Sequence, residues 1–486
     1  MASKVRDVLI VGGGVMGCST AYHLAKKAAG SLRISVIERS FGYKRASAVL
    51  SAGGIRMQFS EKQNIQMSQY GLEFIRSAKD NLTVPSMDPV DVNFVENGYL
   101  FLATEKGRTI LENNNVVQKS VGAPVDILSP EELKKRFPWL STDDIIAGAF
   151  GAKDEGWFDP WAYLTGLKRK CADLGVEFIE GELAGNMQVD NQSINKVDIA
   201  TTAGEVVSIA PGHVVNASGA WAHPVAMAAG IHDLPIRARK RTVFVFQCPE
   251  AANWTGDACS PLVVDPSGVY FRPEGCSGQF ICGYSPEEEK DPDCEENDPF
   301  HPDYELFDEF IWPTIAERVP AFEAIKMVNA WAGFYDFNTF DHNAIIGKYP
   351  DRDNFYCING FSGHGLQQSP AAGRAIAELI HDVKINMATQ RDRKYDVYGD
   401  GTPCEGIETN IESFSIEHLA SVNSVIAQRT QERRKINFNP SEGQVHARER
   451  NCPWRVAVNN KIALANQRAQ EEQWEKRRIG LAKQVS

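Results

Sequence analysis

The fold of this chain is decided by the stretch DVLIVGGGVMG, which runs from Asp7 to Gly17. An apolar run of strand length leads into three glycines and then into helical periodicity, the order found in a dinucleotide-binding βαβ unit. Gly12 permits the tight turn, Gly14 lets the backbone approach a pyrophosphate, and Gly17 allows close packing of helix on strand. The free N–H groups at the start of the helix favour a phosphate. The stretch predicts a dinucleotide site, with a plain Gly-rich turn as the alternative.

An acidic residue closes the second strand of the same unit. Glu38 follows the predicted strand Ile34–Ile37 and lies 21 residues beyond Gly17. At this point of a βαβ unit a carboxylate can accept hydrogen bonds from both hydroxyls of an adenosine ribose. Strand-like and helical segments alternate up to about residue 40, which is typical of a parallel sheet covered by helices. We therefore expect an α/β fold with a doubly wound, Rossmann-like domain.

A second Gly-rich segment indicates which dinucleotide binds. Residues Gly360–Leu366 again join a strand, Phe355–Ile358, to a helix, Pro370–His381. This position, far along the chain from the first turn, suits an isoalloxazine ring lying far from the adenine. A helix N-terminus there would stabilise negative charge on the N1/O2 edge of a reduced flavin. The segment favours FAD, and a helix cap without a ligand is the alternative.

The order of composition along the chain predicts two interleaved domains. Residues 235–335 are rich in strands and suit an antiparallel or mixed sheet in a substrate domain. We expect the FAD-binding domain in residues 5–90, 151–234 and 336–390, the substrate domain in 91–150 and 235–335, and a polar tail, mobile or loosely docked, in 391–486. Asn97-Gly98 predicts a tight hairpin. Ser129-Pro130-Glu131-Glu132 predicts the capped start of a helix.

Charge and composition exclude several classes of function. The net charge of −12, from 51 basic and 63 acidic residues, argues against a large nucleic-acid surface. No apolar run approaches the length of about 18 residues that a membrane span needs. Ten cysteines occur without any C-x-x-C pair, which predicts neither a disulfide framework nor a metal site. Metal-ligand spacing, a Walker A loop and a G-x-S-x-G elbow are all missing.

The sequence resembles the D-amino-acid oxidase / sarcosine oxidase superfamily of FAD-dependent amine oxidoreductases. The resemblance covers roughly residues 5–385 and implies hydride transfer from a secondary or tertiary amino acid to FAD, with a small amino-acid-like substrate as ligand. The segments that carry it are Val11–Leu24, Glu38-Arg39, Ser51–Ile55, Asn216–Trp221, Trp331–Gly333 and Gly360–Gln367.

Three segments are similar to one mitochondrial branch of this superfamily, whose member assists the assembly of respiratory complex I. They are Asp154–Pro160, Gly333–Asp341 and Gly360–Gln368. This resemblance implies a mitochondrial location, in the matrix or at the inner membrane, with complex I subunits or assembly intermediates as partners. The alternatives are an assembly chaperone or scaffold whose FAD is structural and, because no presequence precedes Asp7, a location in the cytoplasm.

The resemblance also implies which residues contact the flavin and the substrate. Arg56 could face the substrate, although an arginine facing solvent or phosphate is the alternative. Tyr270 and Arg272 are candidates for an aromatic wall and a carboxylate clamp, since a guanidinium matches a carboxylate bidentately; a structural ion pair is the alternative for Arg272. His364 is expected to orient backbone rather than to move protons. Beyond Gly12, Gly14, Gly17 and Glu38, the implied FAD-binding residues are Arg39 near the adenine, Ser47, Ser51, Gly53, Gly54, Ile55, Gly219, Trp221, Gly333, Gly360, Ser362, Gly363, His364, Gly365, Leu366 and Gln367.

Two departures from the family pattern shape the expected chemistry. In sarcosine oxidases a cysteine anchors FAD, but here Phe334 stands at about that position. In dimethylglycine dehydrogenases a histidine early in the chain is the anchor, but this sequence has no histidine between His23 and His213. We therefore expect noncovalent FAD. Sarcosine oxidases also place a lysine where this chain has Ile281, two residues before Gly283. A fixed positive charge beside the flavin speeds electron transfer to O₂. Because this chain has an uncharged isoleucine in place of the lysine, we predict a dehydrogenase rather than an oxidase.

Overall fold

The computed structural model describes residues 4–254, 259–295 and 298–391. In this part of the chain two eight-stranded sheets and one two-stranded sheet are present. The predicted tail, residues 391–486, lies outside the described residues except for Arg391. None of the helices in these ranges is long and apolar enough to cross a bilayer.

The first sheet is the mainly parallel one that the N-terminal stretch predicts. Its strands are β1 (Lys4–Val11), β2 (Ile34–Glu38), β8 (Glu177–Leu183), β9 (Gln188–Asp190), β10 (Ser193–Thr201), β11 (Val206–Asn216), β17 (Ile345–Lys348) and β18 (Phe355–Asn359). They lie in the order β17-β18-β11-β1-β2-β8-β10-β9. The five central strands, β18 to β8, run parallel. The doubly wound α/β class predicted from the sequence is thus confirmed.

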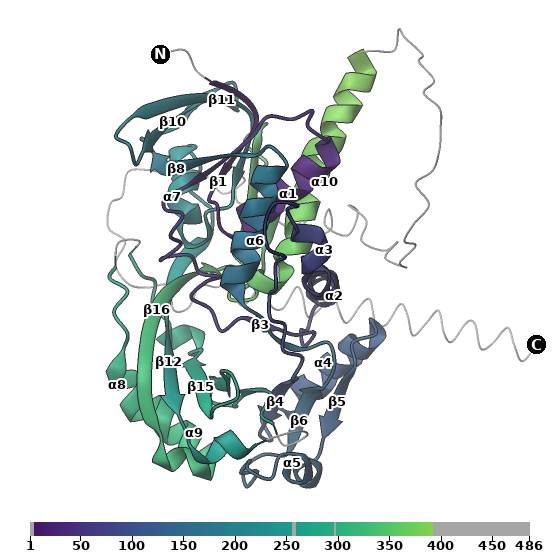
Figure 1. The fold of residues 1–486 in the computed structure, drawn as a ribbon, viewed down its shortest axis with the longest axis vertical. Coiled ribbons are helices and arrows are strands. Elements are labelled where there is room, and N and C mark those ends of the chain that lie inside the picture. Colours follow the sequence, from purple (N-terminus) through teal and green to yellow (C-terminus); the bar gives the residue numbers. More distant parts are fainter. Residues whose placement is uncertain (1–3, 255–258, 296–297, 392–486) are drawn as a thin grey trace, which may run out of the picture. The chain divides into compact units, whose positions relative to one another are not determined.

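Helices cover both faces of this sheet because its side chains alternate. Val8 and Ile10 of β1 pack on one face with α1 (Val15–Ala28), α6 (Pro160–Asp173) and α10 (Gly365–Arg391). Leu9 and Val11 point to the other face and pack with α7 (Ala222–Ala228). In Figure 1 α1, α6 and α10 lie side by side against the sheet. A strand buried on both faces reads as a continuous apolar run, as Val8–Val11 does.

The second sheet is mixed, and it draws strands from two distant parts of the chain. Its strands are β4 (Tyr99–Ala103), β5 (Val125–Leu128), β6 (Ala147–Gly151), β12 (Ile236–Gln247), β13 (Leu262–Val264), β14 (Val269–Pro273), β15 (Gln279–Tyr284) and β16 (Lys326–Asn338). They lie in the order β16-β12-β15-β14-β13-β4-β6-β5, and only the β13–β4 pair is parallel. Aromatic side chains, among them Phe246, Phe271 and Phe280, fill the core beneath it around Phe322.

The remaining elements connect or cover the sheets. β3 (Gly54–Ile55) and β7 (Gly156–Trp157) form the two-stranded sheet. The other α-helices are α2 (Lys62–Arg76), α3 (Ala78–Leu82), α4 (Arg108–Ser120), α5 (Pro130–Arg136), α8 (Tyr304–Leu306) and α9 (Trp312–Arg318). The short 3₁₀ turns are η1 (Gly219–Trp221), η2 (Glu250–Asn253), η4 (Glu288–Lys290) and η6 (Pro320–Ala324), and η5 (Phe307–Ile311) is a π-helical turn.

One local prediction is confirmed and one is wrong. Ser129 caps α5, with the reciprocal Ser129–Glu132 hydrogen bonds of a capping box. The hairpin predicted at Asn97-Gly98 does not form. Val95 pairs with Trp157 instead, and β4 pairs with β6 and β13. Long-range partners therefore take the strand hydrogen bonds that a local turn would have used.

Candidate functional site

A large cavity, of about 1390 Å³, begins where β1 and β2 end and reaches the second sheet. The crevice beyond the carboxyl ends of parallel strands is the usual place for a ligand in an α/β sheet. The volume exceeds the roughly 300–1,000 Å³ of sites for drug-sized ligands. The cavity therefore has room for an extended cofactor together with a small substrate.

The three glycines of the first turn have different surroundings, and each agrees with the role predicted for that glycine. Gly12 has φ of +104°, and a Cβ there would lie 2.4 Å from the carbonyl oxygen of Ala217. A Cβ on Gly17 would lie 1.8 Å from the carbonyl oxygen of Gly12, so this glycine permits helix α1 to pack on the turn. A Cβ on Gly14 would meet nothing within 4 Å. Gly14 therefore faces open space at the start of α1, where a pyrophosphate would lie.

Glu38 closes this nucleotide end of the cavity. Its Oε2 accepts a hydrogen bond from the N–H of Gly13 at 2.8 Å, and its Oε1 accepts one from Ser40 at 3.2 Å. Burial raises the pKa of Glu38, and the hydrogen bonds from Gly13 and Ser40 oppose that shift. Carboxylate lone pairs remain for ribose hydroxyls, since each oxygen accepts two hydrogen bonds.

Cations and aromatic rings line the next stretch of the cavity. The guanidinium groups of Arg39 and Arg45 lie 5.0 and 5.2 Å from the ring centroid of Trp221. Arg39 also pairs with Glu182 at 3.4 Å. The sequence predicted Arg39 and Trp221 but missed Arg45, which lies on an irregular loop without a motif. Two cations here suit the negative charge of phosphate groups.

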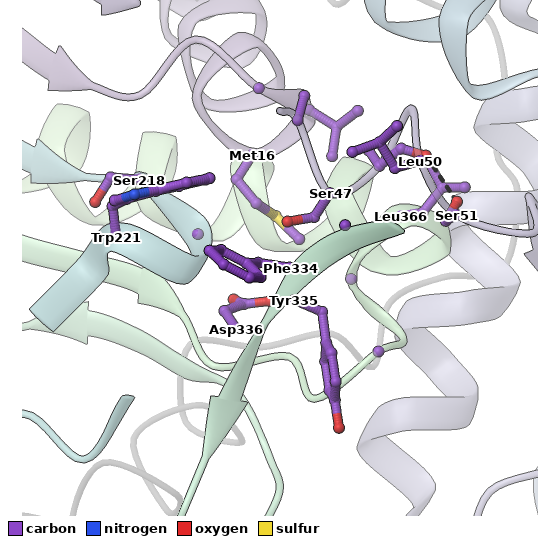
Figure 2. A pocket seen from close by; sticks show the side chains of 18 of the residues that line it. Met16, Ser47, Leu50, Ser51, Ser218, Trp221, Phe334, Tyr335, Asp336 and Leu366 are labelled. Carbon is purple, nitrogen blue, oxygen red and sulfur yellow. Dashed lines mark hydrogen bonds between the residues drawn. The ribbon is translucent and has the colours of Figure 1, made fainter. Parts of the chain in front are cut away.

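Figure 2 shows the middle of the cavity. Ser218 and Trp221 lie on one side, Leu50, Ser51 and Leu366 on the other, and Met16 and Phe334 between them. Ser51 shapes its loop: its hydroxyl donates to the carbonyl oxygen of Ala48 at 2.7 Å and accepts from the N–H of Gly53 at 3.2 Å. This side chain therefore helps to fix the backbone that faces the cavity.

Asp336 holds the second Gly-rich loop in place. Its Oδ2 accepts hydrogen bonds from the N–H groups of Gly360 at 2.6 Å and Phe361 at 3.2 Å. Burial raises its pKa to about 6, while these N–H groups oppose the shift. In Figure 2 the side chains of Asp336 and Tyr335 point in different directions, as neighbours on a strand do. Gly363 and Gly365 then lead into α10 along the cavity wall.

Arg56 lies at the substrate end, in a box of aromatic rings. Its guanidinium lies 4.0 Å from the ring centroid of Phe59 and 5.2 Å from that of Phe101. One of its nitrogens, Nη1, donates to the carbonyl oxygen of Gln58. Burial lowers the pKa of Arg56. Among the described residues Arg56 forms no ion pair with a carboxylate, so its charge is available to a ligand.

The other two arginines of this region are already paired. Arg272 does not line the cavity. It donates to the carbonyl oxygen of Ala52 at 2.8 Å and pairs with Glu274 at 2.6 Å. The prediction of Arg272 as a substrate clamp is therefore corrected, and its alternative, a structural ion pair, describes it. Arg241 lines the cavity but binds Asp291 bidentately, at 2.8 and 2.6 Å.

Tyr270 and His364 lie in the wall near Arg56. A Cβ on Gly283 would lie 2.4 Å from the hydroxyl oxygen of Tyr270, so the missing side chain makes room for that tyrosine. Burial, with a smaller contribution from the charge of Arg56, lowers the pKa of His364 to about 3. The imidazole is therefore neutral at physiological pH. Its Nε2 is buried, has no hydrogen-bond partner among the described residues, and belongs to the cavity wall.

Most of the predicted site residues meet around the cavity. Gly17, Ile55, Gly360 and Arg272 do not line it and instead support its walls: Ile55, for example, is fully buried and pairs with Gly156. The predicted residues that line it are Gly12, Gly14, Glu38, Arg39, Ser47, Ser51, Gly53, Gly54, Arg56, Gly219, Trp221, Tyr270, Gly333, Ser362, Gly363, His364, Gly365, Leu366 and Gln367.

Sequence reasoning missed several wall residues of the substrate end, namely Tyr99, Phe101, Arg241, Tyr335 and Asp336. Tyr99 and Phe101 face the same side of β4, with ring centroids 5.5 Å apart. Alternate residues of a strand share a face, but their spacing does not tell which face meets the cavity. Asp336 lies within the segment Gly333–Asp341, which carries a resemblance to known proteins, so the sequence did contain a signal for this residue.

Comparison with known proteins decides the family. A family model described as "FAD dependent oxidoreductase" matches residues 7–379. The chain belongs to this FAD-dependent oxidoreductase family. It is 44% identical over 407 residues to FAD-dependent oxidoreductase domain-containing protein 1 of Xenopus laevis, which covers 77% of this chain and 79% of that protein.

Two further similar proteins are more distant. Mitochondrial sarcosine dehydrogenase of Mus musculus is 26% identical over 382 residues, covering 77% of this chain and 39% of that protein. The crystal structure of L-proline dehydrogenase from P. horikoshii is 26% identical in sequence, with a TM-score of 0.66 over 79% of this chain and 95% of that chain. These matches confirm the resemblance predicted from the sequence.

The residues of the cavity fit the cofactor of this FAD-dependent family. Gly14 leaves space at a helix N-terminus for the pyrophosphate, and Glu38 stands where a ribose would bind. At the far end the unpartnered Nε2 of His364 and the N-terminus of α10 supply polar groups for a heterocycle. Glu38, Arg39 and Arg45 would therefore hold the adenosine diphosphate half, and residues 362–367 the flavin half.

Proposed function

We propose that this chain oxidises a small secondary or tertiary amino acid, with FAD as the electron acceptor. One observation carries the proposal: Arg56 lines the cavity near the second Gly-rich loop and has no carboxylate partner among the described residues. A cation left unpaired in a largely buried site needs an anion to compensate the cost of its burial. The α-carboxylate of an amino acid supplies that anion.

The chain's own residues would bind and orient this substrate. The guanidinium of Arg56 forms charge-assisted hydrogen bonds with the carboxylate. The rings of Tyr99, Phe101 and Tyr270 line the same end and exclude water. FAD, when bound, accepts a hydride from the α-carbon. Because His364 is neutral, Arg56 carries the unpaired cationic charge of this end, and that charge favours a substrate amine that binds without a proton.

An anaerobic screen tests the proposal. The FAD-loaded protein is mixed with L-proline, with N-methyl amino acids and with the amide of each, and loss of the flavin's visible absorbance is followed. The acids are expected to bleach the flavin faster than the amides, because only an acid offers a charge to Arg56. Equal rates for acid and amide, or no bleaching by any secondary or tertiary amine, would contradict the proposal.

We further propose that FAD is held without a covalent bond. Of the described residues that line the cavity, none is a cysteine. Phe334, which stands about where the family's cysteine anchor is expected, is 2% exposed and packs near Trp221. Heat or acid precipitation is expected to release the yellow chromophore into the supernatant. Colour that stays with the precipitate would rule this mode of binding out.

The electron acceptor is proposed to be a partner other than O₂. Ile281 is buried in an apolar cluster with Val243, Val245 and Trp331. Its neighbour across the strands, Arg272, has its charge paired with Glu274. Because isoleucine carries no charge and the charge of Arg272 is paired, neither side chain would stabilise the step in which O₂ gains charge. Slow reoxidation of photoreduced wild type in air-saturated buffer, and faster reoxidation of Ile281→Lys, are the expected stopped-flow results.

A second proposed role is assistance in the assembly of mitochondrial respiratory complex I. It is supported by the segments Asp154–Pro160 and Gly333–Asp341 named above and by the 44% identity to the Xenopus laevis relative. Wild type and an Arg56→Met variant that retains FAD are both expected to fractionate with mitochondria and to co-purify with complex I subunits. Loss of co-purification in the variant alone would tie the assembly role to catalysis, and its absence in both would refute it.

A further inference from the structure

A fully buried carboxyl group lies directly behind Arg56. Glu155 stands in the turn between β6 and β7, is 0% exposed and does not line the cavity. Its Oε1 accepts a hydrogen bond from the N–H of Met57 at 2.7 Å, and its Oε2 accepts one from Nε2 of Gln58 at 2.8 Å. Both donors are neutral and both belong to the segment that follows Arg56.

These hydrogen bonds tie Arg56 to the second sheet. Nε2 of Gln58 also donates to the carbonyl oxygen of Tyr99 at 2.9 Å, and the carbonyl oxygen of Gln58 accepts from Arg56. A Cβ on Gly151 would lie 2.2 Å from the Glu155 carboxylate, so the β6 backbone packs tightly against it. Glu155 therefore has no room to turn away from its partners or to reach solvent.

We propose that Glu155 is a positioning residue for the carboxylate site at Arg56, and that this site binds an anionic substrate when Glu155 is protonated and loses affinity when Glu155 ionises. The inference rests on the proposed function, because it requires that Arg56 bind the substrate carboxylate. An ionised Glu155 would offset the charge of Arg56 and repel the incoming anion through a region of low dielectric constant. The neutral acid keeps Arg56 in place without that repulsion.

The charged groups around Glu155 agree with this role. Burial raises the pKa of Glu155 to about 8, against the opposing hydrogen bonds of Gln58 and Met57 and the charge of Arg56. The other titratable groups that face it are Asp154, whose charge is paired with Arg76 at 2.8 Å, and Tyr99, whose pKa is itself raised by burial. Since Asp154 adds to the shift, its charge also opposes ionisation of Glu155.

The experiment measures the affinity of FAD-loaded protein for cyclopentanecarboxylate, a ring acid that cannot be oxidised as an amine, and for its neutral amide. Flavin difference absorbance gives Kd between about pH 7 and about pH 9.5 at constant ionic strength. The Kd of the acid is expected to rise about tenfold as the pH passes about 8, and that of the amide to stay constant. Glu155→Gln, which mimics the neutral acid, is expected to bind the acid tightly at every pH.

Matched controls separate this inference from the function on which it rests. Asp154→Asn, whose left-handed backbone tolerates asparagine, is expected to keep a pH-dependent Kd for the acid, with its midpoint moved to lower pH because one charge that opposes ionisation of Glu155 is removed. Arg56→Met is expected to abolish binding of the acid at every pH. If wild type does not bind the acid, or Arg56→Met binds it equally well, the proposed function fails with the inference. A pH-independent Kd in wild type, with binding still dependent on Arg56, overturns the inference alone.

A measurement on wild type covers the case in which Glu155→Gln does not fold. Calorimetric titration with cyclopentanecarboxylate at about pH 8, in buffers of different ionisation enthalpy, gives the number of protons taken up on binding. If Glu155 is partly ionised in the free protein, binding of the acid is expected to be accompanied by uptake of a fraction of a proton, largest near the pH at which the Kd changes. No uptake would overturn the inference, as would an equal uptake with the amide.

Discussion

The two ends of the cavity are built by different means. At the nucleotide end, glycines and free N–H groups of β1, α1 and their connecting turn face the ligand, and Glu38 adds one carboxylate. At the substrate end, side chains face the ligand: Arg56, Tyr99 and Tyr270 come from three separate parts of the chain. A site made of backbone needs a continuous motif, whereas a site made of side chains needs only the right residues at the right places in the fold.

This difference explains why one end was predictable and the other was not. The spacing of Gly12, Gly14 and Gly17 dictates a conformation wherever it follows a strand and opens a helix. Arg272 has the same chemistry as Arg56, and no local pattern tells the two apart. The two arginines differ in their neighbours: Glu274 pairs with Arg272, whereas Arg56 faces the cavity. Which groups surround each arginine depends on the pairing of segments that lie far apart along the chain.

The largest expected effects come from replacing two glycines of the nucleotide end by valine, one of which should prevent folding and the other FAD binding. Gly17→Val is expected to abolish folding, because its Cβ alone would lie 1.8 Å from the carbonyl oxygen of Gly12. Gly14→Val is expected to fold yet to retain no FAD, because its side chain enters open space that the pyrophosphate would need. Circular dichroism and the flavin content after dialysis check the pair. A Gly14→Val protein with a full complement of FAD would place the cofactor elsewhere.

The next effect contrasts the two arginines of the substrate end. Arg56→Met is expected to raise the KM of an amino acid substrate about 100-fold, since a hydrogen bond to a charged group contributes roughly 1.5–3 kcal/mol. Arg272→Met is expected to lower Tm instead, because the carbonyl oxygen of Ala52 loses its donor and Glu274 loses its ion pair. Steady-state kinetics and thermal melts of both variants test this. A KM effect as large for Arg272→Met would restore that residue as the substrate clamp.

A smaller loss of affinity is expected when the carboxylate of the nucleotide end is removed. Glu38→Ala should weaken FAD binding at least about tenfold, because the ribose hydroxyls lose a charged acceptor. The N–H of Gly13 loses its acceptor as well, so the turn itself loosens. Fluorescence titration of apoprotein with FAD measures the change. An unchanged Kd would show that Glu38 does not hold the ribose.

The smallest expected effect is a loss of stability caused by a substitution outside the cavity. Ser129→Ala removes the capping box of α5 and is expected to lower the free energy of unfolding by about 1 kcal/mol. FAD content and KM are expected to stay at the wild-type values, since Ser129 does not line the cavity. Denaturant unfolding followed beside flavin absorbance checks both statements. A change in flavin content would mean that α5 influences the cavity.

Particular residues show how far the sequence could predict this molecule. The first βαβ unit, the capping box and the second Gly-rich loop follow from local chemistry and were predicted. The hairpin at Asn97-Gly98 was not found, because Val95 pairs with Trp157. Glu155 also escaped prediction. It contacts Met57 and Gln58, which lie nearly 100 residues earlier in the chain, and an acidic residue in a turn normally signals solvent.

The place of α10 and β18 has a consequence for how the protein is made. β18 pairs with β11 in the centre of the first sheet, and α10 packs on α1, so closely that a Cβ on Gly373 would lie 2.3 Å from the hydroxyl oxygen of Ser19. The N-terminal motif is therefore synthesised long before its neighbours arrive. Contacts between residues so far apart form slowly, because the loop between them must first close. On the ribosome, the cofactor site stays incomplete until residues 355–375 have emerged, so capture of FAD is a late event in biosynthesis and requires nearly the whole described chain.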